Sequence, residues 1–570
     1  MPDAHTRAGL KALESTPRAL PWLAVLLATV TFAWLVRGLS RGLELTDESF
    51  YLLSAIHADS IRLFFTPTHW ISGALWQTSR SLAAFRALGL ALVAASALLL
   101  AWGTLRIAAH VGMAVCADRA ARAGALATAV SGALLYGSLL NLTPSYNLLA
   151  ASGAAIVMGL GLLSITSDSD RRSRILAAIA GITLGITVLS KFSSGICVGG
   201  FLLLLQLALE WKQPSRRLNS FLLAGFAALT VLAVTLSQTG VEEAWRQFRA
   251  GVEVVWFAQG DKSTVVRLGR SALDVQQLLA DTARDFWGPF ACFALALRWW
   301  PRLLGFVGAA WFAALLMTGD YLQAGMSRYA TQGMAATAAL ILCLLARAGT
   351  WARSFPAALL VAVLAALPFA IALGSSNPLQ VQFLTALASW GVLIGLFAFS
   401  IARPGLPAAL IGLLFGVTVL LQVISNGAEP YRMRPYTQQS ETATIGPFGT
   451  VKVDPATATL VRDIDAAAKQ CRIGPGTPFL DFYNLPAVAL MLGAVPVDTP
   501  WLLDAQYASL ALKRADPAVL RRAVIAVKLT EAGGRPAAPS QLPDFPQGYT
   551  LCGRSTGPVD GLAVELWAPR

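Results

Sequence analysis

The sequence predicts an α-helical polytopic membrane protein of about thirteen transmembrane helices with a small C-terminal extracytoplasmic α/β domain. The 570-residue chain is 56% hydrophobic and only 13% charged, and its mean hydropathy is +0.60. A soluble protein carries about 25% charged and roughly 45–50% apolar residues. Apolar stretches long enough to span a bilayer recur through residue 424, and a more polar segment follows.

The predicted spans are separated by short polar loops. They cover residues 20–38, 82–108, 122–140, 147–166, 175–190, 195–210, 219–237, 286–298, 303–318, 329–346, 355–373, 379–401 and 406–424. The eighth span is short. We interpret the first as a retained helix, because no clear small-residue cleavage site follows it.

The basic residues indicate the orientation of the chain. Lysine and arginine cluster in alternate short loops, which the positive-inside rule assigns to the cytoplasm. These loops contain Arg119, Arg122, Arg171, Arg172, Arg174, Lys212, Arg216, Arg217, Arg298, Arg302, Arg347, Arg353 and Arg403. This distribution accounts for the net charge of +13 without a nucleic-acid partner. We therefore expect residues 1–19 in the cytoplasm and the chain in the cell (inner) membrane.

An odd number of spans places residues 426–570 outside, in the periplasm. Two outer loops are long, 39–81 and 240–285, and the segment 242–255 suits a helix on the membrane surface. In the C-terminal domain, 461–471 predicts an amphipathic helix, and 479–482, 523–529 and 562–567 predict strands. Cys471 and Cys552 lie in this domain, where an oxidising compartment could join them, but the sequence leaves their pairing open.

An adjacent acidic pair, Asp47-Glu48, follows the first span by a few residues. Carboxylates are costly near hydrocarbon and therefore indicate a function. They could serve as a general base or metal ligands facing a lipid-linked substrate. Equally, Thr46 or Asp47 could cap a helix that starts at Glu48, where the helix dipole favours negative charge. The two interpretations are compatible.

Two basic residues depart from the charge distribution of the loops. Lys191 lies between two apolar runs on the predicted outer side, where it could bind a phosphate or extend its ammonium group from a helix end to the interface. Arg328, at the outer start of the tenth span, offers a two-pronged phosphate ligand. Tyr329 beside it is also an ordinary residue of the membrane interface.

Other polar groups in the outer loops are less specific. His69, in Pro67-Thr68-His69-Trp70, could shuttle a proton or simply be an interfacial side chain. The loop that ends with Tyr146 and Asn147 could line a substrate cavity or form a plain turn. The chain has no P-loop, GxGxxG opening a helix, HExxH or GxSxG, which argues against nucleotide hydrolysis.

Taken together, these motifs resemble the GT-C fold glycosyltransferases, and most closely the protein O-mannosyltransferase-like and lipid A aminoarabinose transferase-like branch. Asp47-Glu48 followed by Tyr51 matches the acidic pair of the family, and Phe85-Arg86 resembles the arginine that opens its second span. The stretch from Phe64 to Trp70, with His69, loosely matches a proline-containing stretch of the family. The resemblance covers about residues 20–425.

The sequence also departs from the family. Arg328-Tyr329 matches an Arg-Tyr pair, but Gln332-Gly333 replaces a proline that often follows it. The loop from Pro144 to Asn147 lacks an acid that the family often has there. This departure argues against a two-carboxylate or metal-dependent mechanism, and a divalent metal stays among the alternatives.

The resemblance implies transfer of a sugar from a polyprenyl-phosphate donor to a lipid, glycan or protein acceptor at the outer face of the membrane, with inversion. Asp47 is then the first choice for the base and Glu48 the second. The phosphate ligands would be Lys191, Arg328 and Tyr329, and the cavity would be lined by Tyr51, His69, Arg86, Tyr146 and Asn147. The main alternative is a transporter or flippase of lipid-linked saccharides, and a second is a membrane scaffold.

Overall fold

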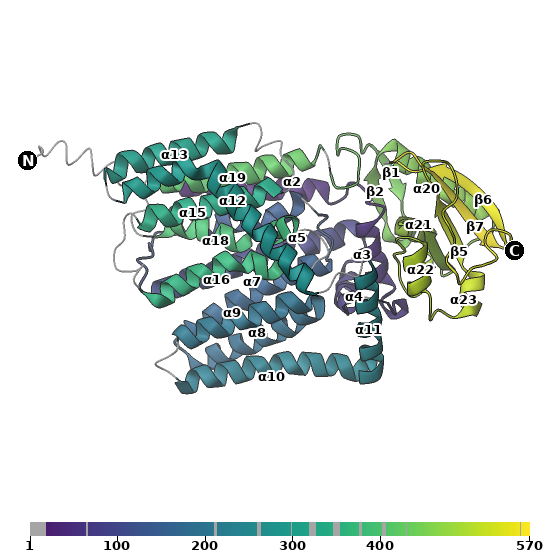
Figure 1. The fold of residues 1–570 in the computed structure, drawn as a ribbon, viewed down its shortest axis with the longest axis horizontal. Helices are drawn as coiled ribbons and strands as arrows, with labels where there is room; N and C mark the ends of the chain where they lie inside the picture. The colour runs from purple at the N-terminus through teal and green to yellow at the C-terminus, as the bar shows by residue number, and fades with distance from the viewer. Residues whose placement is uncertain are drawn as a thin grey trace, which may run out of the picture.

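The computed structural model describes residues 19–570 except 64–65, 139, 210–213, 259–263, 298, 319–326, 346–353, 375–378, 402–405, 429 and 559. A long helical bundle carries a smaller α/β domain at one end (Figure 1). Within the described residues, eight helices are long and apolar enough to span a membrane. These features confirm the predicted fold class, whereas the count of thirteen spans is not established.

The bundle is assembled from helices that are apolar over most of their length. In the described residues it contains α2 (Ala19–Gly38), α5 (Leu82–His110), α6 (Arg119–Leu134), α7 (Tyr146–Ile165), α8 (Asp170–Ser190), α9 (Phe192–Leu209), α10 (Pro214–Thr239), α12 (Thr264–Ala296), α13 (Pro301–Met317), α15 (Ser327–Leu345), α16 (Phe355–Ala372), α18 (Ala388–Gly395) and α19 (Leu406–Asn426).

Glycines bring pairs of these helices into close contact. A Cβ atom added to Gly103 of α5 would lie 2.6 Å from the carbonyl oxygen of Gly159 on α7. A Cβ atom on Gly391 of α18 would lie 2.7 Å from the carbonyl oxygen of Thr128 on α6. Small residues at helix crossings are typical of membrane proteins, where packing replaces the hydrophobic effect as the force between helices.

Two predicted spans differ from the structure. The span 379–401 is broken into α17 (Leu379–Gln382), a 3₁₀ turn over Phe383–Ala386, α18 and a π-helical turn over Leu396–Ser400. The span 286–298 is the last part of α12, which begins at Thr264 and has non-helical backbone angles at Phe286. Much of the predicted loop 240–285 is therefore helical.

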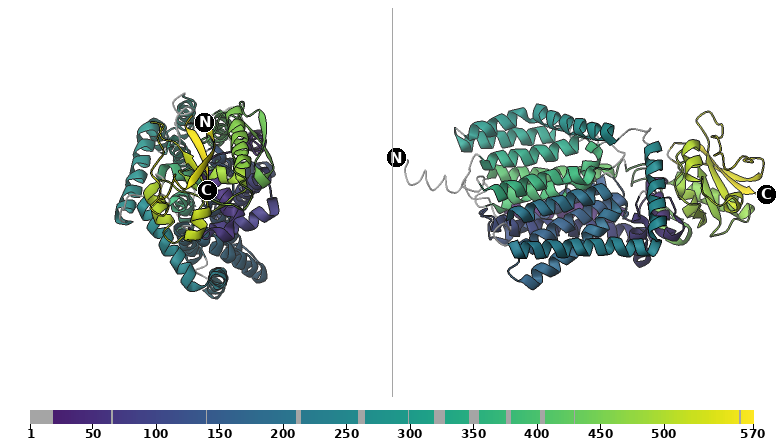
Figure 2. Two further views of the ribbon diagram at one scale, coloured as in Figure 1. Left: turned by 90° about the vertical axis from the view of Figure 1, so that its right-hand side faces the viewer. Right: turned by 60° about the horizontal axis from the view of Figure 1, so that its bottom comes forward.

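The rest of that loop forms α11 (Val241–Ala258), which lies across the end of the bundle beside the C-terminal domain (Figures 1 and 2). Trp245 and Phe248 are exposed on α11, and their rings stack with centroids 5.7 Å apart. Exposed aromatic groups on a strongly amphipathic helix suit the membrane surface, as the sequence predicts for 242–255.

The first outer loop contains two helices, α3 (Asp47–Ile56) and α4 (Thr68–Ser79), joined through a 3₁₀ turn over Ala58–Ser60. They pack closely, since a Cβ atom on Gly73 of α4 would lie 3.1 Å from the carbonyl oxygen of Ala55. This loop is therefore an ordered layer over the end of the bundle.

The C-terminal domain has a five-stranded sheet of order β4-β3-β5-β7-β6 and a separate β1-β2 hairpin. The strands are β1 (Glu441–Thr444), β2 (Thr450–Val453), β3 (Pro478–Phe482), β4 (Val495–Pro496), β5 (Val524–Lys528), β6 (Tyr549–Thr556) and β7 (Ala563–Pro569), and the helices are α20 (Pro455–Gln470), α21 (Pro486–Leu492), α22 (Ala505–Ala511) and α23 (Pro517–Arg522). β3 pairs in parallel with β4 and β5, and β7 pairs antiparallel with β5 and β6. A mixed sheet with flanking helices agrees with the predicted α/β domain.

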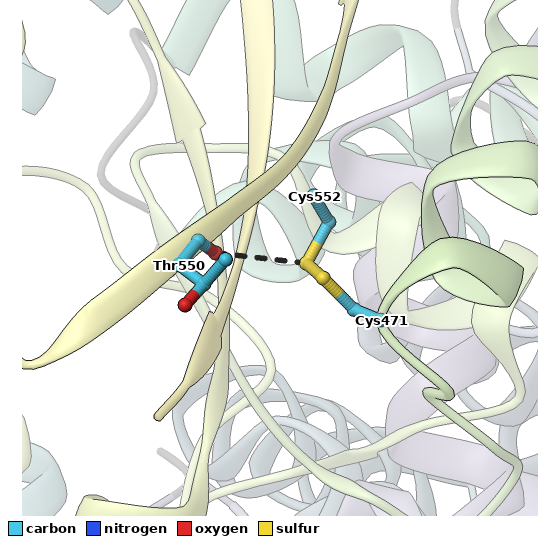
Figure 3. Close-up of a disulfide and its surroundings, with 3 residues drawn as sticks. All are labelled: Cys471, Thr550 and Cys552. Carbon is cyan, nitrogen blue, oxygen red and sulfur yellow. Dashed lines mark hydrogen bonds between the residues drawn. A yellow bond between two sulfur atoms is a disulfide. The ribbon is translucent and has the colours of Figure 1, made fainter.

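A disulfide joins Cys471, at the end of α20, to Cys552 in β6 (Figure 3). The Cα atoms of the two residues are 5.6 Å apart. The sequence left this pairing open, and in the structure the two cysteines are bonded. The bond fixes α20 to the antiparallel edge of the sheet.

The first outer loop and the C-terminal domain share one hydrophobic core. Leu45, Leu52 and Phe85 pack in the same buried cluster as Phe448 and Leu490. Separating the domain from the loop would expose this shared apolar core to water, which is unfavourable. The domain is therefore docked on the loop and not merely linked to it.

Backbone hydrogen bonds reinforce this docking. The amide of Gly42 donates to the carbonyl oxygen of Lys452 at 2.7 Å, and the amide of Lys452 donates to that of Ser40 at 2.9 Å. At the other end of the loop, the amide of Leu63 donates to the carbonyl oxygen of Asp498 at 3.1 Å. The loop is therefore held by the C-terminal domain at two separate points.

Candidate functional site

Glu48 is buried and paired with Arg86, which lies near the start of α5. The Nε and Nη2 atoms of Arg86 donate to the two carboxylate oxygens of Glu48 at 2.7 and 2.5 Å. Thr143 also donates to Glu48, at 2.6 Å. The remaining donors of Arg86 bind the carbonyl oxygens of residues 39, 41 and 42 at 2.7–3.0 Å. This arrangement fixes the start of α3 against the bundle.

Glu44 caps α3, in place of the residues considered from the sequence. One carboxylate oxygen accepts the backbone N–H of Glu48 at 2.6 Å, and the other accepts the N–H of Thr46 at 2.9 Å and its hydroxyl group. Thr46 itself makes no side-chain capping bond. Burial is the largest influence on Glu44 and raises its pKa from 4.5 to about 7, in spite of these donors.

Asp47 takes no part in the Glu48–Arg86 pair and is partly exposed, with 28% of its side-chain surface accessible. The hydroxyl group of Tyr431 donates to Oδ2 of Asp47 at 2.8 Å. Nη1 of Arg432 lies 3.5 Å from Oδ1 and donates to the hydroxyl oxygen of Thr46 at 2.5 Å. Asp47 therefore has ordered donors and remains open to solvent, as a reacting carboxylate requires.

Aromatic side chains surround this carboxylate. Tyr51, one turn along α3, lies with its ring centroid 6.0 Å from that of Tyr146, the first residue of α7. Burial is the first cause that raises the pKa of Tyr51 well above 10, followed by the charges of Tyr146 and Asp47. Phe50 lies 5.3 Å from Trp501 of the C-terminal domain, centroid to centroid. The surroundings of Asp47 thus combine the loop, the bundle and the C-terminal domain.

Lys191 is buried at the junction of α8 and α9. Its Nζ atom donates to the carbonyl oxygens of Ile371 and Ala372, at 2.8 and 3.4 Å, at the end of α16. Among the described residues, no carboxylate lies within ion-pairing distance of it. Burial without a carboxylate partner lowers the pKa of Lys191 from 10.5 to about 7, and an anionic ligand would favour its charged form.

The start of α4 lies against this junction. The hydroxyl groups of Thr66 and Thr68 each donate to the carbonyl oxygen of Ser190 at 3.1 Å. Pro67, the N-cap residue of α4, makes no side-chain capping bond, so the positive dipole end of this helix has no cap from it. His69, in the first turn, is buried, and burial lowers its pKa to about 4, which makes it neutral near pH 7.

The remaining predicted site residues are not all placed. Asn147 is buried in the first turn of α7, next to Tyr146. The side chains of Arg328 and Tyr329 lie outside the described residues, although α15 begins at Ser327. In the part of the chain that is described, no group of three or more His, Cys, Asp and Glu side chains could hold a metal ion.

The structure groups the predicted residues into two sites that α3 and α4 connect. Asp47, Tyr51 and Tyr146 form one group, with the Glu48–Arg86 pair beneath it. Lys191 and the start of α4 form the other. The fold and these sites define a polytopic helical membrane protein with ionisable side chains gathered where the α/β domain is docked.

Comparisons with known proteins give one structural match to report. No protein-family model matches the chain, and no curated protein matches it. The crystal structure of ArnT from Cupriavidus metallidurans bound to undecaprenyl phosphate is similar, with 14% sequence identity and a TM-score of 0.43 over 95% of this chain and 97% of that chain. ArnT, a GT-C lipid A aminoarabinose transferase, belongs to the branch that the sequence resembles. A likeness at this level carries no function from that protein to the present chain.

Sequence reasoning missed Glu44, Tyr431 and Arg432 as members of the site. Glu44 is the third acid within five residues, and this density was a signal that it belongs to the same cluster. Tyr431 and Arg432 lie in the segment between α19 and β1. No local pattern reveals that this segment returns to Asp47 across 384 positions.

Proposed function

We propose that this chain transfers a sugar from a polyprenyl-phosphate donor to an acceptor at the outer face of the membrane. The observation that carries the proposal is the placement of a partly exposed carboxylate, Asp47, and a buried amino group, that of Lys191, at the same end of the bundle. α3 and α4 connect the two sites, because α3 begins at Asp47 and α4 begins on the α8–α9 junction. The acceptor is a lipid, a glycan or a protein.

Lys191 binds the phosphate group of the donor in this proposal. An ammonium group has three N–H donors, and two of them point at carbonyl oxygens of α16. In the part of the chain that is described, the third has no acceptor and can donate to a phosphate oxygen, and the start of α4 adds favourable potential. The prenyl chain would lie beside the apolar helices, which places the phosphate at their outer end. Arg328 and Tyr329 remain further candidates for this role.

Asp47 is the general base. It takes the proton of the acceptor hydroxyl group while the acceptor oxygen forms a bond to the anomeric carbon. The bond between that carbon and the phosphate oxygen breaks, and the electron pair leaves with the polyprenyl phosphate. Lys191 stabilises the negative charge that develops on the leaving group. A single displacement of this kind inverts the anomeric configuration.

Glu48 has a different role in this proposal from Asp47. Its carboxylate oxygens already accept three side-chain donors, from Arg86 and Thr143. An acid so occupied is poorly suited to take a proton, and we assign it to holding α3 in position. Tyr51, Tyr146 and Asn147 would line the space between base and donor, and His69 would lie close to the phosphate.

Two observations support an outer location for the site. Among the described residues, the first turns of α8 contain Arg171, Arg172 and Arg174, at the end of that helix opposite Lys191. The positive-inside rule expects such residues in a cytoplasmic loop. The disulfide lies in the domain at the site end, and such bonds persist in oxidising compartments such as the periplasm. We accordingly place the protein in the inner membrane with its C-terminal domain in the periplasm.

The test measures release of polyprenyl phosphate from a panel of undecaprenyl-phosphate monosaccharides by the purified full-length chain. Loss of a base or of a charge-stabilising donor typically costs about 10²- to 10³-fold in kcat. We expect Asp47→Asn and Lys191→Ala to lose activity to that extent, and Lys191→Ala also to weaken binding of undecaprenyl phosphate. Lys469→Ala is the matched control, because this exposed lysine pairs with Asp465 on α20. Full activity in Asp47→Asn would refute the base assignment.

A second candidate function, transport of a lipid-linked saccharide, has one observation in its favour. A small cavity within the bundle is lined by Ser96, Ser152, Thr385 and Ser389. Among the described residues, the hydroxyl groups of Ser152 and Ser389 have no hydrogen-bond partner. Transport of a fluorescent undecaprenyl-phosphate sugar across proteoliposomes, without turnover of any donor in the panel, would favour this function over transfer.

A further inference from the structure

We infer that Tyr431 and Arg432 are positioning residues for Asp47, supplied by the segment that joins the bundle to the C-terminal domain. This inference deepens the proposed function and rests on it. Both residues follow α19, which ends at Asn426. Tyr431 donates to one oxygen of Asp47 at 2.8 Å, and Arg432 approaches the other at 3.5 Å. The carboxylate is thus held by both of its oxygens from one side.

The segment is itself built to present these two side chains. The amide of Tyr436 donates to the carbonyl oxygen of Gly427 at 2.9 Å, which closes the segment into a loop. Arg434 donates to the carbonyl oxygen of Pro558 at 3.1 Å, and Arg41 donates to that of Tyr436 at 3.1 Å. The loop is therefore anchored on the C-terminal domain and on the first outer loop.

The backbone of Arg432 supports the same conclusion. Its φ angle is +51°, in the left-handed region that residues other than glycine rarely adopt. An ordinary turn would place glycine or asparagine there. Arginine adopts this unfavourable backbone conformation here, and its side chain contacts Asp47 and Thr46. Backbone strain of this kind is found where the surrounding structure fixes a side chain for function.

The two contacts differ in strength. The Asp47–Arg432 pair is long, and 45% of the arginine side chain is exposed, so solvent screens it strongly. The hydroxyl group of Tyr431 is at ordinary hydrogen-bond distance from the carboxylate, and burial is the main cause that raises the pKa of Tyr431 far above 10, which keeps it a donor. Tyr431 should therefore orient the base, with Arg432 giving a smaller contribution.

This orientation matters because a general base acts only within hydrogen-bond reach of the proton that it removes. A misplacement of about 1 Å can cost roughly 10²-fold in rate. The hydroxyl group of Tyr431 donates to Oδ2 of Asp47, and the remaining lone pairs of the carboxylate can accept the proton of the acceptor hydroxyl group. Removing the phenol would leave the carboxylate free to rotate, while the phosphate site at Lys191 would be unchanged.

The experiment compares kcat and the KM for the donor in the full-length chain, with the undecaprenyl-phosphate monosaccharide that the wild type uses. We expect Tyr431→Phe to lower kcat by about 10- to 100-fold at unchanged KM. Arg432→Ala should lower it by no more than about fivefold. Tyr431→His, which keeps a ring N–H donor, should recover part of the loss. Tyr483→Phe is the control, since it removes a phenol that donates to Ala537 within the C-terminal domain.

The outcomes separate this inference from the proposed function. An inactive Asp47→Asn variant together with full kcat in Tyr431→Phe would overturn the positioning role alone. Higher activity in Tyr431→Phe would also overturn it, because the phenol would then be occupying the place of the acceptor hydroxyl group. Full activity in Asp47→Asn would instead refute the base, and this role with it. Unfolding midpoints measured for each variant exclude a loss of the folded protein.

Discussion

Arg86 and Glu48 form a fully paired ion pair in the interior, with two nitrogen–oxygen contacts of 2.7 and 2.5 Å between them. Removing one partner of such a buried pair leaves an uncompensated charge, at a cost of about 3–5 kcal/mol. We expect Glu48→Gln to lower the unfolding midpoint of the purified protein markedly.

The matched control for Glu48→Gln is Glu441→Gln. Glu441 pairs with Arg462 at 3.0 Å on the surface, and both side chains are exposed. Its substitution should shift the midpoint very little. A Glu48→Gln variant with a normal unfolding midpoint and no activity would contradict the structural role and favour a chemical one.

Glu44 should make the free energy of unfolding fall as pH rises from 4.5 to about 7. Its pKa is raised from 4.5 to about 7, so the folded state binds a proton that the unfolded state has released between these values. Stability from this group is therefore present below pH 4.5 and is lost toward pH 7, by about 3 kcal/mol at most.

Unfolding midpoints between pH 5 and pH 8 would check this expectation, in steps of about half a unit. His69 has the opposite slope, because its pKa is lowered from 6.5 to about 4. Asp481, raised to about 7, has the same slope as Glu44. The difference between wild type and Glu44→Gln isolates the one group. Identical slopes in the two proteins would show that Glu44 does not titrate in this range.

The disulfide should be present in the protein isolated from membranes. Cys471 and Cys552 should react with a maleimide only after reduction, whereas Cys116, in the loop between α5 and α6, should react without it. Cys471→Ser should destabilise the C-terminal domain by about 2–4 kcal/mol. Reaction of Cys552 in the unreduced protein would contradict the pairing and weaken the periplasmic assignment.

The crossing of α5 and α7 should not tolerate a methyl group. Gly103→Ala would place a Cβ atom 2.6 Å from the carbonyl oxygen of Gly159, so the helices must separate. Gly200→Ala, on α9, meets nothing within 4 Å, and alanine in a helix otherwise gains about 0.5–1 kcal/mol over glycine. We expect opposite shifts in the unfolding midpoint. Equal shifts would show that the two helices do not cross at this point.

Much of the fold could be predicted because its signals are local. Long apolar runs give spanning helices, and the predicted strands at 479–482 and 523–529 correspond to β3 and β5. The break in the span 379–401 could not be predicted, since α17, a 3₁₀ turn, α18 and a π turn have the same apolar composition as one continuous helix. The choice among them is made by neighbours such as α6 and α16.

The candidate site was predictable only where the chemistry lies in adjacent residues. Asp47-Glu48 and Lys191 stand out against their apolar surroundings. The different roles proposed for Asp47 and Glu48 depend on Arg86 and Thr143, which lie 38 and 95 positions from Glu48 in the sequence. Likewise, predicting the disulfide requires knowing how α20 packs against β6, and this packing is a tertiary property.

The docked C-terminal domain also imposes an order in time. Asp47 is synthesised early, and Tyr431 follows it by 384 residues. At about 5–20 residues per second, this interval lasts roughly 20 to 80 s. Throughout this interval Leu43, Leu45 and Leu52 lack the part of their hydrophobic cluster that begins at Ala443. A chain interrupted before residue 431 would contain the proposed base and the proposed phosphate ligand. The base would lack the hydrogen bond that orients it. The last quarter of synthesis would therefore complete the site.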